Sequence, residues 1–258
     1  MKLLSLNMHC GKEENYNEKL NRIASFIVDN DIDVILLQEV SQSIVSPLLK
    51  MKSNVIIKED NLVDILCTKT NSLSSTPYDY YYDVSHIGFD TLEEGLAILT
   101  KHTIDSLDSR YVSSTTDLSD WKARKIVRAT IDDGKQRINF YSCHFGWWED
   151  NEHPAKCQFD LFDQWLNKEE VSIIGGDFNN NAGEEGYQYL TRSLNYVDLV
   201  YKSNPDLFLV PTIYEGDRIK PIDYIFSTSE IDVVDAKHVF TKKDGMVSDH
   251  VALYIEIK

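Results

Sequence analysis

Short hydrophobic runs that end in polar residues recur along the whole chain. The runs at residues 34–37 and 171–174 are apolar throughout, which is typical of strands buried on both faces. Similar segments predict further strands at residues 2–6, 95–99, 126–131, 138–143, 224–226, 233–240 and 251–257. The pattern therefore predicts a protein in which strands are the main element.

Apolar residues recur at helical spacing in fewer places. One helix is expected between the first two predicted strands, with Asn17 as its N-cap. A second is expected at residues 155–166, where Pro154 suits the first turn, and a third at residues 184–194. Such helices are enough to cover two outer faces, so we predict an α/β fold with two packed mixed β-sheets flanked by helices. No linker or repeat divides the chain, and residues 1–258 are expected to form one domain.

Composition narrows the range of partners. The chain has 26 Lys and Arg against 42 Asp and Glu, a formal net charge of −16, and no long basic run. Because nucleic-acid binding draws affinity from Lys and Arg at the phosphates, this charge favours a small substrate over nucleic acid. No apolar run approaches the roughly 20 residues of a membrane span, the apolar N-terminus is too short for a signal peptide, and the four cysteines have no metal-binding spacing. We therefore expect a cytoplasmic protein without a membrane partner; nothing in the sequence predicts an oligomeric state.

Polar residues with related chemistry stand where predicted strands begin or end. They are Asn7, Glu39, His144, Asp177, Asn179, Asp223, Asp249 and His250. The most specific segment is Gly175-Gly176-Asp177-Phe178-Asn179, where two glycines after an apolar strand let the backbone turn sharply beside a ligand. Carboxylates, amides and histidines gathered in one pocket can hold a hard divalent cation and hydrolyse a phosphate ester.

The order of these motifs resembles a known family. Leu6-Asn7, Leu37-Gln38-Glu39, the glycine-containing segment above, Ile222-Asp223-Tyr224 and Ser248-Asp249-His250 are similar to motifs of the endonuclease/exonuclease/phosphatase superfamily. That superfamily contains deoxyribonuclease I, exonuclease III, inositol polyphosphate 5-phosphatases and neutral sphingomyelinases. The resemblance extends from residue 3 to residue 257 and implies the deoxyribonuclease I-like four-layer α/β sandwich.

The resemblance also implies a metal centre. Glu39 matches the principal Mg²⁺ ligand, Asn7 lies beside it at metal or phosphate, and Asp249 is a second carboxylate on the metal side. Mg²⁺ prefers one or two carboxylates plus waters, which suits Glu39, and Mn²⁺ is expected to substitute.

The same resemblance implies the catalytic roles. Asp177 orients or deprotonates the attacking water, and Asn179 hydrogen-bonds a phosphate oxygen. His250 is held by Asp223. His144, which the exonuclease III branch usually lacks, has Glu94 as its carboxylate partner, with Glu93 the adjacent alternative. Adjacent carboxylates are expected to keep both histidines protonated, so that both can donate to the phosphate or the leaving group.

The segment His144-Phe145-Gly146-Trp147-Trp148 bears on the substrate. Indole faces beside a catalytic histidine suit a sugar ring, and the segment resembles bacterial members of the superfamily that are maltose 6'-phosphate phosphatases. Trp147 and Trp148 are therefore expected to bind the sugar, and Arg124 to clamp the substrate phosphate. The other histidines, His9, His86, His102, His153 and His238, are expected to be solvent or packing residues.

Two alternatives to a sugar-phosphate phosphatase stay open. A phosphodiesterase, either a nuclease or a sphingomyelinase-like enzyme, would be expected to show basic loops, or an export signal with an apolar membrane-contacting hairpin. The sequence pattern indicates neither. A non-catalytic binding module is the more distant alternative, because every matched position holds a chemically competent residue.

Overall fold

Two six-stranded sheets pack face to face in the computed structural model, which describes residues 1–132, 134 and 136–258. In spatial order the first sheet consists of β15 (Val233–Val239), β16 (Ala252–Ile257), β1 (Lys2–Asn7), β2 (Val34–Ser43), β6 (Leu92–Thr100) and β5 (Asp79–Gly88). The second consists of β11 (Val197–Asp198), β14 (Asp223–Ser227), β10 (Val171–Asp177), β9 (Arg137–His144), β8 (Lys125–Asp132) and β7 (Ile104–Tyr111). Both sheets are mixed, since β1 and β2 run parallel, as do β9 and β10.

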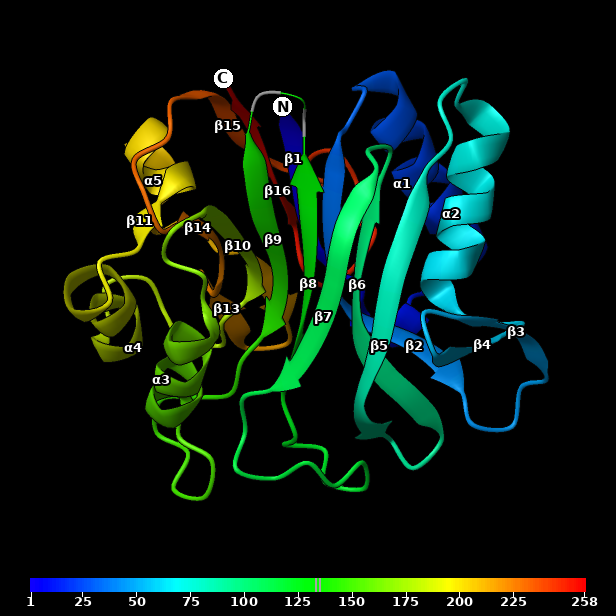
Figure 1. Ribbon diagram of the computed structural model, residues 1–258, viewed down its shortest axis with the longest axis horizontal. Coiled ribbons are helices and arrows are strands. Elements are labelled where there is room, and N and C mark those ends of the chain that lie inside the picture. Colours follow the sequence, from blue (N-terminus) through cyan, green and yellow to red (C-terminus); the bar gives the residue numbers. More distant parts are fainter. Residues whose placement is uncertain (133, 135) are drawn as a thin grey trace.

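Helices cover the outer face of each sheet (Figure 1). The helical segments are α1 (Tyr16–Asp29), α2 (Leu62–Leu73), α3 (Ala155–Trp165), α4 (Glu185–Gln188) and α5 (Leu199–Ser203), with short turns η1 (His9–Gly11), η2 (Tyr189–Ser193) and η3 (Pro205–Leu207). In Figure 1, α1 and α2 lie on one side of the paired sheets and α3, α4 and α5 on the other. The predicted four-layer α/β sandwich is confirmed.

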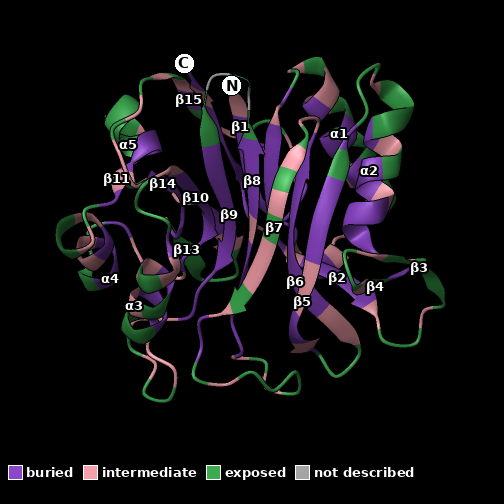
Figure 2. Ribbon diagram, in the orientation of Figure 1, coloured by how far each residue is buried: buried purple, intermediate pink, exposed green. Residues whose placement is uncertain are grey.

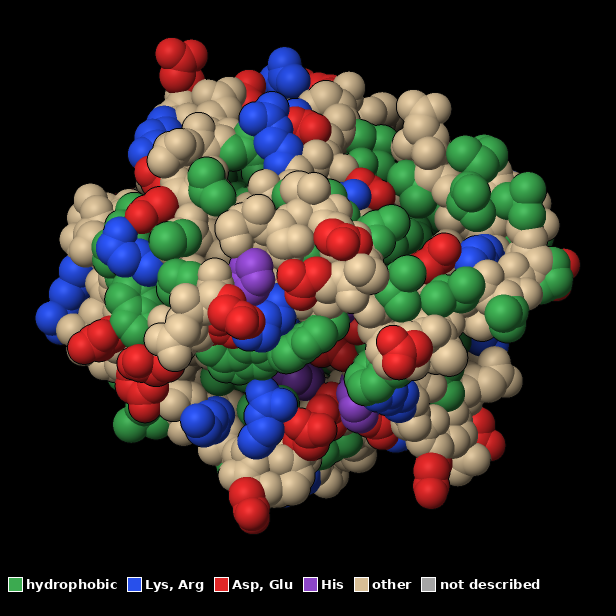
Figure 3. Space-filling view, turned by 90° about the horizontal axis from the view of Figure 1, so that it is seen from below, with side chains coloured by type: hydrophobic (Ala, Val, Ile, Leu, Met, Phe, Trp, Pro, Cys, Tyr) green, Lys and Arg blue, Asp and Glu red, His purple; other side chains and the backbone are tan. Residues whose placement is uncertain are grey.

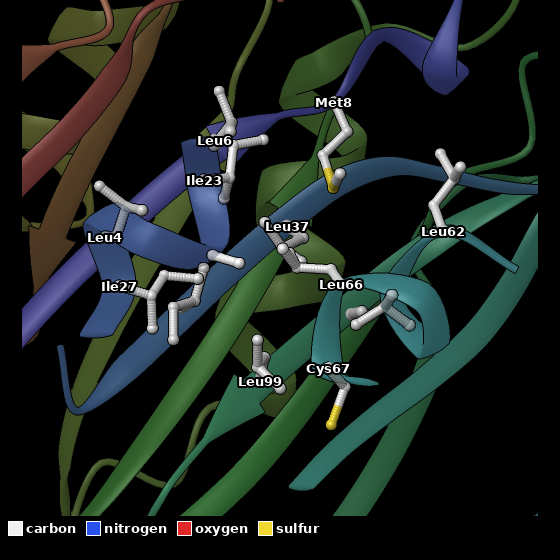
Figure 4. Close-up of a cluster of buried hydrophobic side chains, with 14 of the residues drawn as sticks. Leu4, Leu6, Met8, Ile23, Ile27, Leu37, Leu62, Leu66, Cys67 and Leu99 are labelled. Atoms are coloured by element: carbon white, nitrogen blue, oxygen red, sulfur yellow. The ribbon is translucent and has the colours of Figure 1, made fainter. Parts of the chain in front are cut away.

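The alternation of side chains along the strands explains three hydrophobic layers. On β1, Leu3 points between the two sheets, whereas Leu4 and Leu6 point outward and pack under α1 and α2. Figure 4 shows this outer cluster, with Leu4, Leu6 and Leu37 from the strands facing Ile23 and Leu66 from the helices. A third cluster lies between the second sheet and α3. Figure 2 shows the central strands buried along most of their length.

The predicted strands all correspond to observed strands, but the helices differ in detail. The N-cap of α1 is Asn15 rather than Asn17, which lies inside the first turn. The predicted third helix begins as α4 and continues as the π-helical turn η2. Helix α2 was not predicted. It contains β-branched residues with low helix propensity, and its packing against α1 together with the Asn61 side-chain cap outweighs that propensity.

Two hairpins lie outside the main sheets, β3 (Leu48–Lys52) with β4 (Val55–Lys58) and β12 (Ile213–Glu215) with β13 (Arg218–Lys220). The β3–β4 hairpin exposes Leu48, Met51 and Ile56, and Figure 3 shows hydrophobic side chains on that side of the molecule. The sequence pattern did not indicate this exposed hairpin, which carries Lys50 and Lys52 beside its apolar residues. Within the described residues, no helix combines the length and the apolar character needed to cross a membrane.

The topology brings the polar strand ends together. Strand β1 ends at Asn7, opposite Gln38 and just before the Glu39 bulge of the parallel strand β2. The parallel strands β9 and β10 end side by side, with His144 opposite Asp177. Strand β14 runs antiparallel to β10, so its first residue, Asp223, also lies opposite Asp177. The last residues of strands that run in one direction and the first residues of strands that run in the other therefore meet at one end of the sandwich.

Candidate active site

A cavity of about 500 Å³ opens at this end of the sandwich. Figure 3 looks onto it and shows histidine, acidic, basic and hydrophobic side chains around a hollow. The lining includes most of the predicted site residues, namely Glu39, Glu94, Arg124, His144, Trp147, Asp177, Asn179, Asp249 and His250. Enclosure of this many ionisable groups in one cavity is typical of a catalytic site.

Glu39 is aimed into the cavity by an irregularity in β2. The pairing of β2 with β6 shifts register between Leu37 and Val40, and Glu39 adopts a positive φ of 47° within this bulge. Asn7 connects it to the second sheet, because its amide nitrogen donates to Glu39 Oε1 at 2.9 Å and to Asp177 Oδ2 at 3.2 Å. The Asn7 amide thus holds two carboxylates from different sheets in one place.

His250 and Asp223 form a close, buried pair. Nδ1 of His250 lies 2.9 Å from Oδ2 of Asp223, and both side chains are almost fully buried. Burial opposes a charge on the ring, but Asp223 and then Asp177 outweigh it and raise the pKa of His250 to about 10. His250 is therefore an imidazolium at neutral pH, as predicted.

His144 lies in a different electrostatic environment. Its Nδ1 is 4.0 Å from Glu94 Oε1, and its Nε2 is 3.2 Å from the Asn179 amide nitrogen. Burial, followed by the nearby Arg124 guanidinium, lowers the pKa of His144 well below its ordinary value, despite the opposing effect of Glu94. The expectation that both histidines are protonated is therefore wrong for His144.

The partner of His144 is Glu94 rather than Glu93. Adjacent residues on a strand point to opposite faces, and Glu93 accepts a hydrogen bond from Gln42 and pairs with Lys58 at 3.2 Å. Glu94 is shared with a second histidine, His86, whose Nε2 lies 3.4 Å from the same Oε1. Burial opposes ionisation of Glu94, but His86 and then His144 lower its pKa to about 2.

The carboxylates of the cavity fit a divalent cation. Burial, followed by Asp223, raises the pKa of Asp177 to about 7, and burial with the neighbouring Glu94 raises that of Glu39. Ligand atoms of Glu39, His144 and Asp177 lie within 4.8 Å of one another. Like charges packed this closely favour a bound cation, which would lower both raised values. Asp249 also lines the cavity, where its Oδ1 is 3.4 Å from His9 Nδ1.

The structure separates the two tryptophans. Trp147 lines the cavity, with its ring 5.9 Å from that of Trp121 and 5.8 Å from the Arg124 guanidinium carbon. Trp148 lies outside the lining: its indole nitrogen donates to Glu185 Oε2 at 2.8 Å, and its ring packs against Tyr189. The predicted contact of Trp148 with the substrate therefore has no support in the geometry.

Several lining residues were missed. His9 and His86 were expected to be solvent or packing residues, yet both border the cavity, as do Lys12, Phe89 and Trp121. His9 lies two residues after Asn7, so its proximity to that motif was a usable signal. The others lie on hairpins and loops of the first and second sheets, and no sequence motif marks them.

Cys10 is a further residue next to the carboxylates. It adopts a positive φ of 51°, and its Sγ lies 3.2 Å from Glu94 Oε2 and 3.5 Å from Glu39 Oε2. Burial, reinforced by Glu94 and Glu39, raises the pKa of the Cys10 thiol, so the thiol stays protonated and donates to them. Cys143, by contrast, is fully buried in the cluster under α3 and serves packing.

Comparison with known proteins supports the resemblance seen in the motifs. A model of the Endonuclease/Exonuclease/phosphatase family matches residues 4–250. A search of curated proteins gives no match. Among solved structures, an endonuclease/exonuclease/phosphatase family protein from Leptotrichia buccalis is similar over 100% of this chain and 99% of its own, with 29% sequence identity and a TM-score of 0.90.

More distant structures share the fold. A mannosyl-6-phosphatase from Bacteroides thetaiotaomicron is 16% identical over 100% of this chain and 99% of its own, with a TM-score of 0.64. The human Nocturnin catalytic domain with a bound sulfate anion is 16% identical over 100% of this chain and 94% of its own, with a TM-score of 0.66. At this identity the likeness concerns the fold alone.

Proposed function

The chain belongs to the endonuclease/exonuclease/phosphatase family, and we propose that it is a Mg²⁺-dependent phosphomonoesterase that acts on a small phosphorylated sugar. Members of this family are hydrolases, and divalent metals are their general cofactors. The finer substrate that we propose is maltose 6'-phosphate, which is hydrolysed to maltose and inorganic phosphate.

One observation carries the proposal. Nε2 of His144 and Nε2 of His250 each lie 3.8 Å from Oδ2 of Asp177. His144 is the last residue of β9, and His250 lies just before β16. A carboxylate that can take a proton is thus bordered by the protonated ring of His250, which can donate to a phosphate oxygen, and by the neutral ring of His144, which accepts from Asn179. Phosphoryl transfer depends mainly on positioning and on neutralising these oxygens, and this arrangement supplies both.

Each residue then has a stated role. Glu39 and Asp249 would hold Mg²⁺, with the side-chain oxygen Oδ1 of Asn7 beside them. When bound, the cation would neutralise charge on the phosphate. Asn7 Oδ1 accepts a hydrogen bond from the backbone amide of His9, and its second lone pair is left to contact the cation. Mn²⁺ is expected to substitute for Mg²⁺.

The reaction balances with the groups of this chain. Asp177 in its ionised form accepts a proton from water as the water oxygen bonds to phosphorus. His250, protonated and held by Asp223, donates to a phosphate oxygen. Neutral His144 accepts from the Asn179 amide at Nε2 and so positions Asn179 beside another phosphate oxygen. The bond between phosphorus and the sugar oxygen breaks, and that oxygen takes up one proton, which balances the proton lost by water.

The character of the cavity supports a small sugar phosphate. Its aromatic wall, formed by Trp147 and Trp121, suits a sugar ring, and its volume of about 500 Å³ is within the usual range for small-molecule sites. Lys122 on the neighbouring loop is paired with Asp150 and Glu152, which reduces its attraction for the phosphates of a polynucleotide.

Release of inorganic phosphate tests the proposal. Maltose 6'-phosphate, glucose 6-phosphate, nucleotides and bis-p-nitrophenyl phosphate would be compared with Mg²⁺ and with EDTA, beside plasmid nicking. We expect Mg²⁺-dependent release from sugar monoesters, with Asp177→Asn as the inactive control. Faster cleavage of the diester or of the plasmid would replace the proposal by a phosphodiesterase, and no hydrolysis of any substrate would leave a binding module.

A further inference from the structure

Two bulges lie on either side of β6 at the same height. Val40 of β2 and Val84 of β5 both pair with Gly95, and each strand shifts register next to this position. A side chain at residue 95 would meet the Asp83 carbonyl oxygen at 2.0 Å, so only glycine allows the strands to approach this closely. The first bulge aims Glu39 into the cavity, and the second does the same for His86.

The bulge in β5 is fixed by the loop between β7 and β8. Ser85 Oγ donates to the Ala123 carbonyl oxygen and accepts from the Lys125 amide, at 3.0 Å in each case. The segment that carries His86 is therefore tied to the segment that carries Trp121 and Arg124. His86, Trp121 and Arg124 all line the cavity, and we call this part of the lining the leaving-group wall.

Two buried polar atoms of this wall have no hydrogen-bond partner within the described residues. His86 is 4% exposed and spends Nε2 on Glu94, while its Nδ1 has no hydrogen-bond partner within the described part of the chain. Arg124 is 3% exposed and donates through one terminal nitrogen to the Trp121 carbonyl oxygen, while its Nε likewise lacks a partner there. Both atoms are themselves shielded from the cavity, so the other edges of these two polar side chains, together with the aromatic rings, are what the wall presents to a bound molecule.

The aromatic part of the wall limits what that molecule is. The rings of Trp121 and Trp147 meet at 60°, with centroids 5.9 Å apart, so they form a corner rather than two parallel plates. Trp121 is 52% exposed, which leaves its ring available to a ligand. A corner suits a puckered ring better than a flat base.

We propose that the leaving-group wall binds the sugar of the substrate, with a ring face on Trp121 and ring hydroxyl groups beside the His86 and Arg124 side chains that line the cavity. Hydroxyl groups both donate and accept, so they match a histidine nitrogen in either role and an arginine N–H donor. A site that hydrogen-bonds a substrate hydroxyl strongly rejects an analogue without it. The inference rests on the proposed phosphomonoesterase activity and assigns substrate selection to His86 and Trp121.

Binding of the unphosphorylated product tests the wall without hydrolysis. Maltose would be titrated into the full chain in EDTA, with tryptophan fluorescence and calorimetry as readouts and adenosine as the flat-ring probe. We expect saturable maltose binding that Trp121→Ala and His86→Phe each weaken by about tenfold or more, as ring stacking and a lost hydrogen bond imply. Tighter binding of adenosine than of maltose, or maltose affinities unchanged in both variants, would overturn the inference.

Kinetics separate the wall from the phosphate centre. With Mg²⁺, Trp121→Ala should raise KM for maltose 6'-phosphate by about tenfold, with a much smaller effect on p-nitrophenyl phosphate. Leu118→Ala is the matched control, because Leu118 is an exposed hydrophobic residue of the same loop that is outside the lining. If Trp121→Ala lost activity equally on both substrates, the proposal that the leaving-group wall binds the sugar would be overturned. Intact maltose binding without release of phosphate from any ester would instead overturn the proposed function.

Discussion

The two histidines that flank Asp177 differ in how they are paired. His250 has Asp223 to itself at 2.9 Å, and its pKa is raised to about 10. His144 shares Glu94 with His86, which is nearer to the same oxygen at 3.4 Å than His144 is at 4.0 Å, and its pKa is lowered well below the ordinary value. A neighbouring carboxylate therefore does not by itself protonate a histidine; burial and competition for that carboxylate decide the outcome.

This difference divides the work of the site. The His250 side carries a fixed positive charge and suits charge neutralisation at the phosphate. The His144 side is neutral and connects, through Glu94, to the leaving-group wall with His86 and Arg124. Four predictions test how far the two sides are distinct.

Glu39→Gln removes the carboxylate that both sides depend on and should have the largest effect. We expect a loss of roughly a thousandfold in Mg²⁺-dependent activity, since metal stabilisation of transition-state charge is worth several kcal/mol. The fold should persist, because Gln keeps the size and a carbonyl oxygen for the Asn7 amide. Phosphate release and Mg²⁺ titration of the variant provide the measurement, and wild-type metal affinity would contradict the assignment.

His250→Ala and His144→Ala compare the two sides directly. Removal of the imidazolium should lower kcat by roughly 10²–10⁴-fold with little change in KM, and removal of the neutral ring should cost less. Steady-state kinetics on p-nitrophenyl phosphate measure both without involving the sugar. An equal or larger loss of kcat in His144→Ala would show that the positive charge on His250 is not the larger contribution to catalysis.

Asp223→Asn and Glu94→Gln test the charge states through pH. The raised pKa of His250 means that its protonated form persists up to about pH 10, so loss of Asp223 should move the alkaline limb of activity to lower pH, toward the ordinary value near 6.5. The pairing of protonated His250 with Asp223 stabilises the fold fully below about pH 6.5, and this stabilisation is lost as pH rises through about 10. The lower melting temperature of Asp223→Asn relative to the wild type should therefore become less pronounced as pH rises through that range. Glu94→Gln should leave the alkaline limb in place, and a shift as large as that of Asp223→Asn would contradict the comparison.

Trp147→Ala and Trp148→Ala should have the smallest effects, and of different kinds. Trp147→Ala should weaken use of maltose 6'-phosphate by about tenfold while largely sparing p-nitrophenyl phosphate. Trp148→Ala should affect both substrates equally and lower Tm by about 4–8 °C, since truncating a half-buried tryptophan costs roughly 2 kcal/mol. Thermal unfolding beside two-substrate kinetics distinguishes them, and the reverse pattern would move Trp148 into the site.

Much of the fold and the centre of the site was predictable from local patterns. Apolar runs predicted the central strands, because burial on both faces removes the polar alternation that marks a half-exposed strand. Residues at the strand ends, such as Asp177 and Asp223, were predicted to meet because strand ends are the positions that a sheet brings to one edge. Helix α2 was not predicted, since its stability comes from packing rather than from its own residues.

What the sequence by itself determined is the layered fold and the kinds of ligand and catalytic group that gather at one end of it. Only the tertiary structure decided that Glu94 serves two histidines, that His86 faces the cavity and that Trp148 does not. The physical reason is that these outcomes depend on bulges, loops and neighbours from distant strands. Charge states in particular follow from burial and from every nearby charge, and no local segment of sequence contains that information.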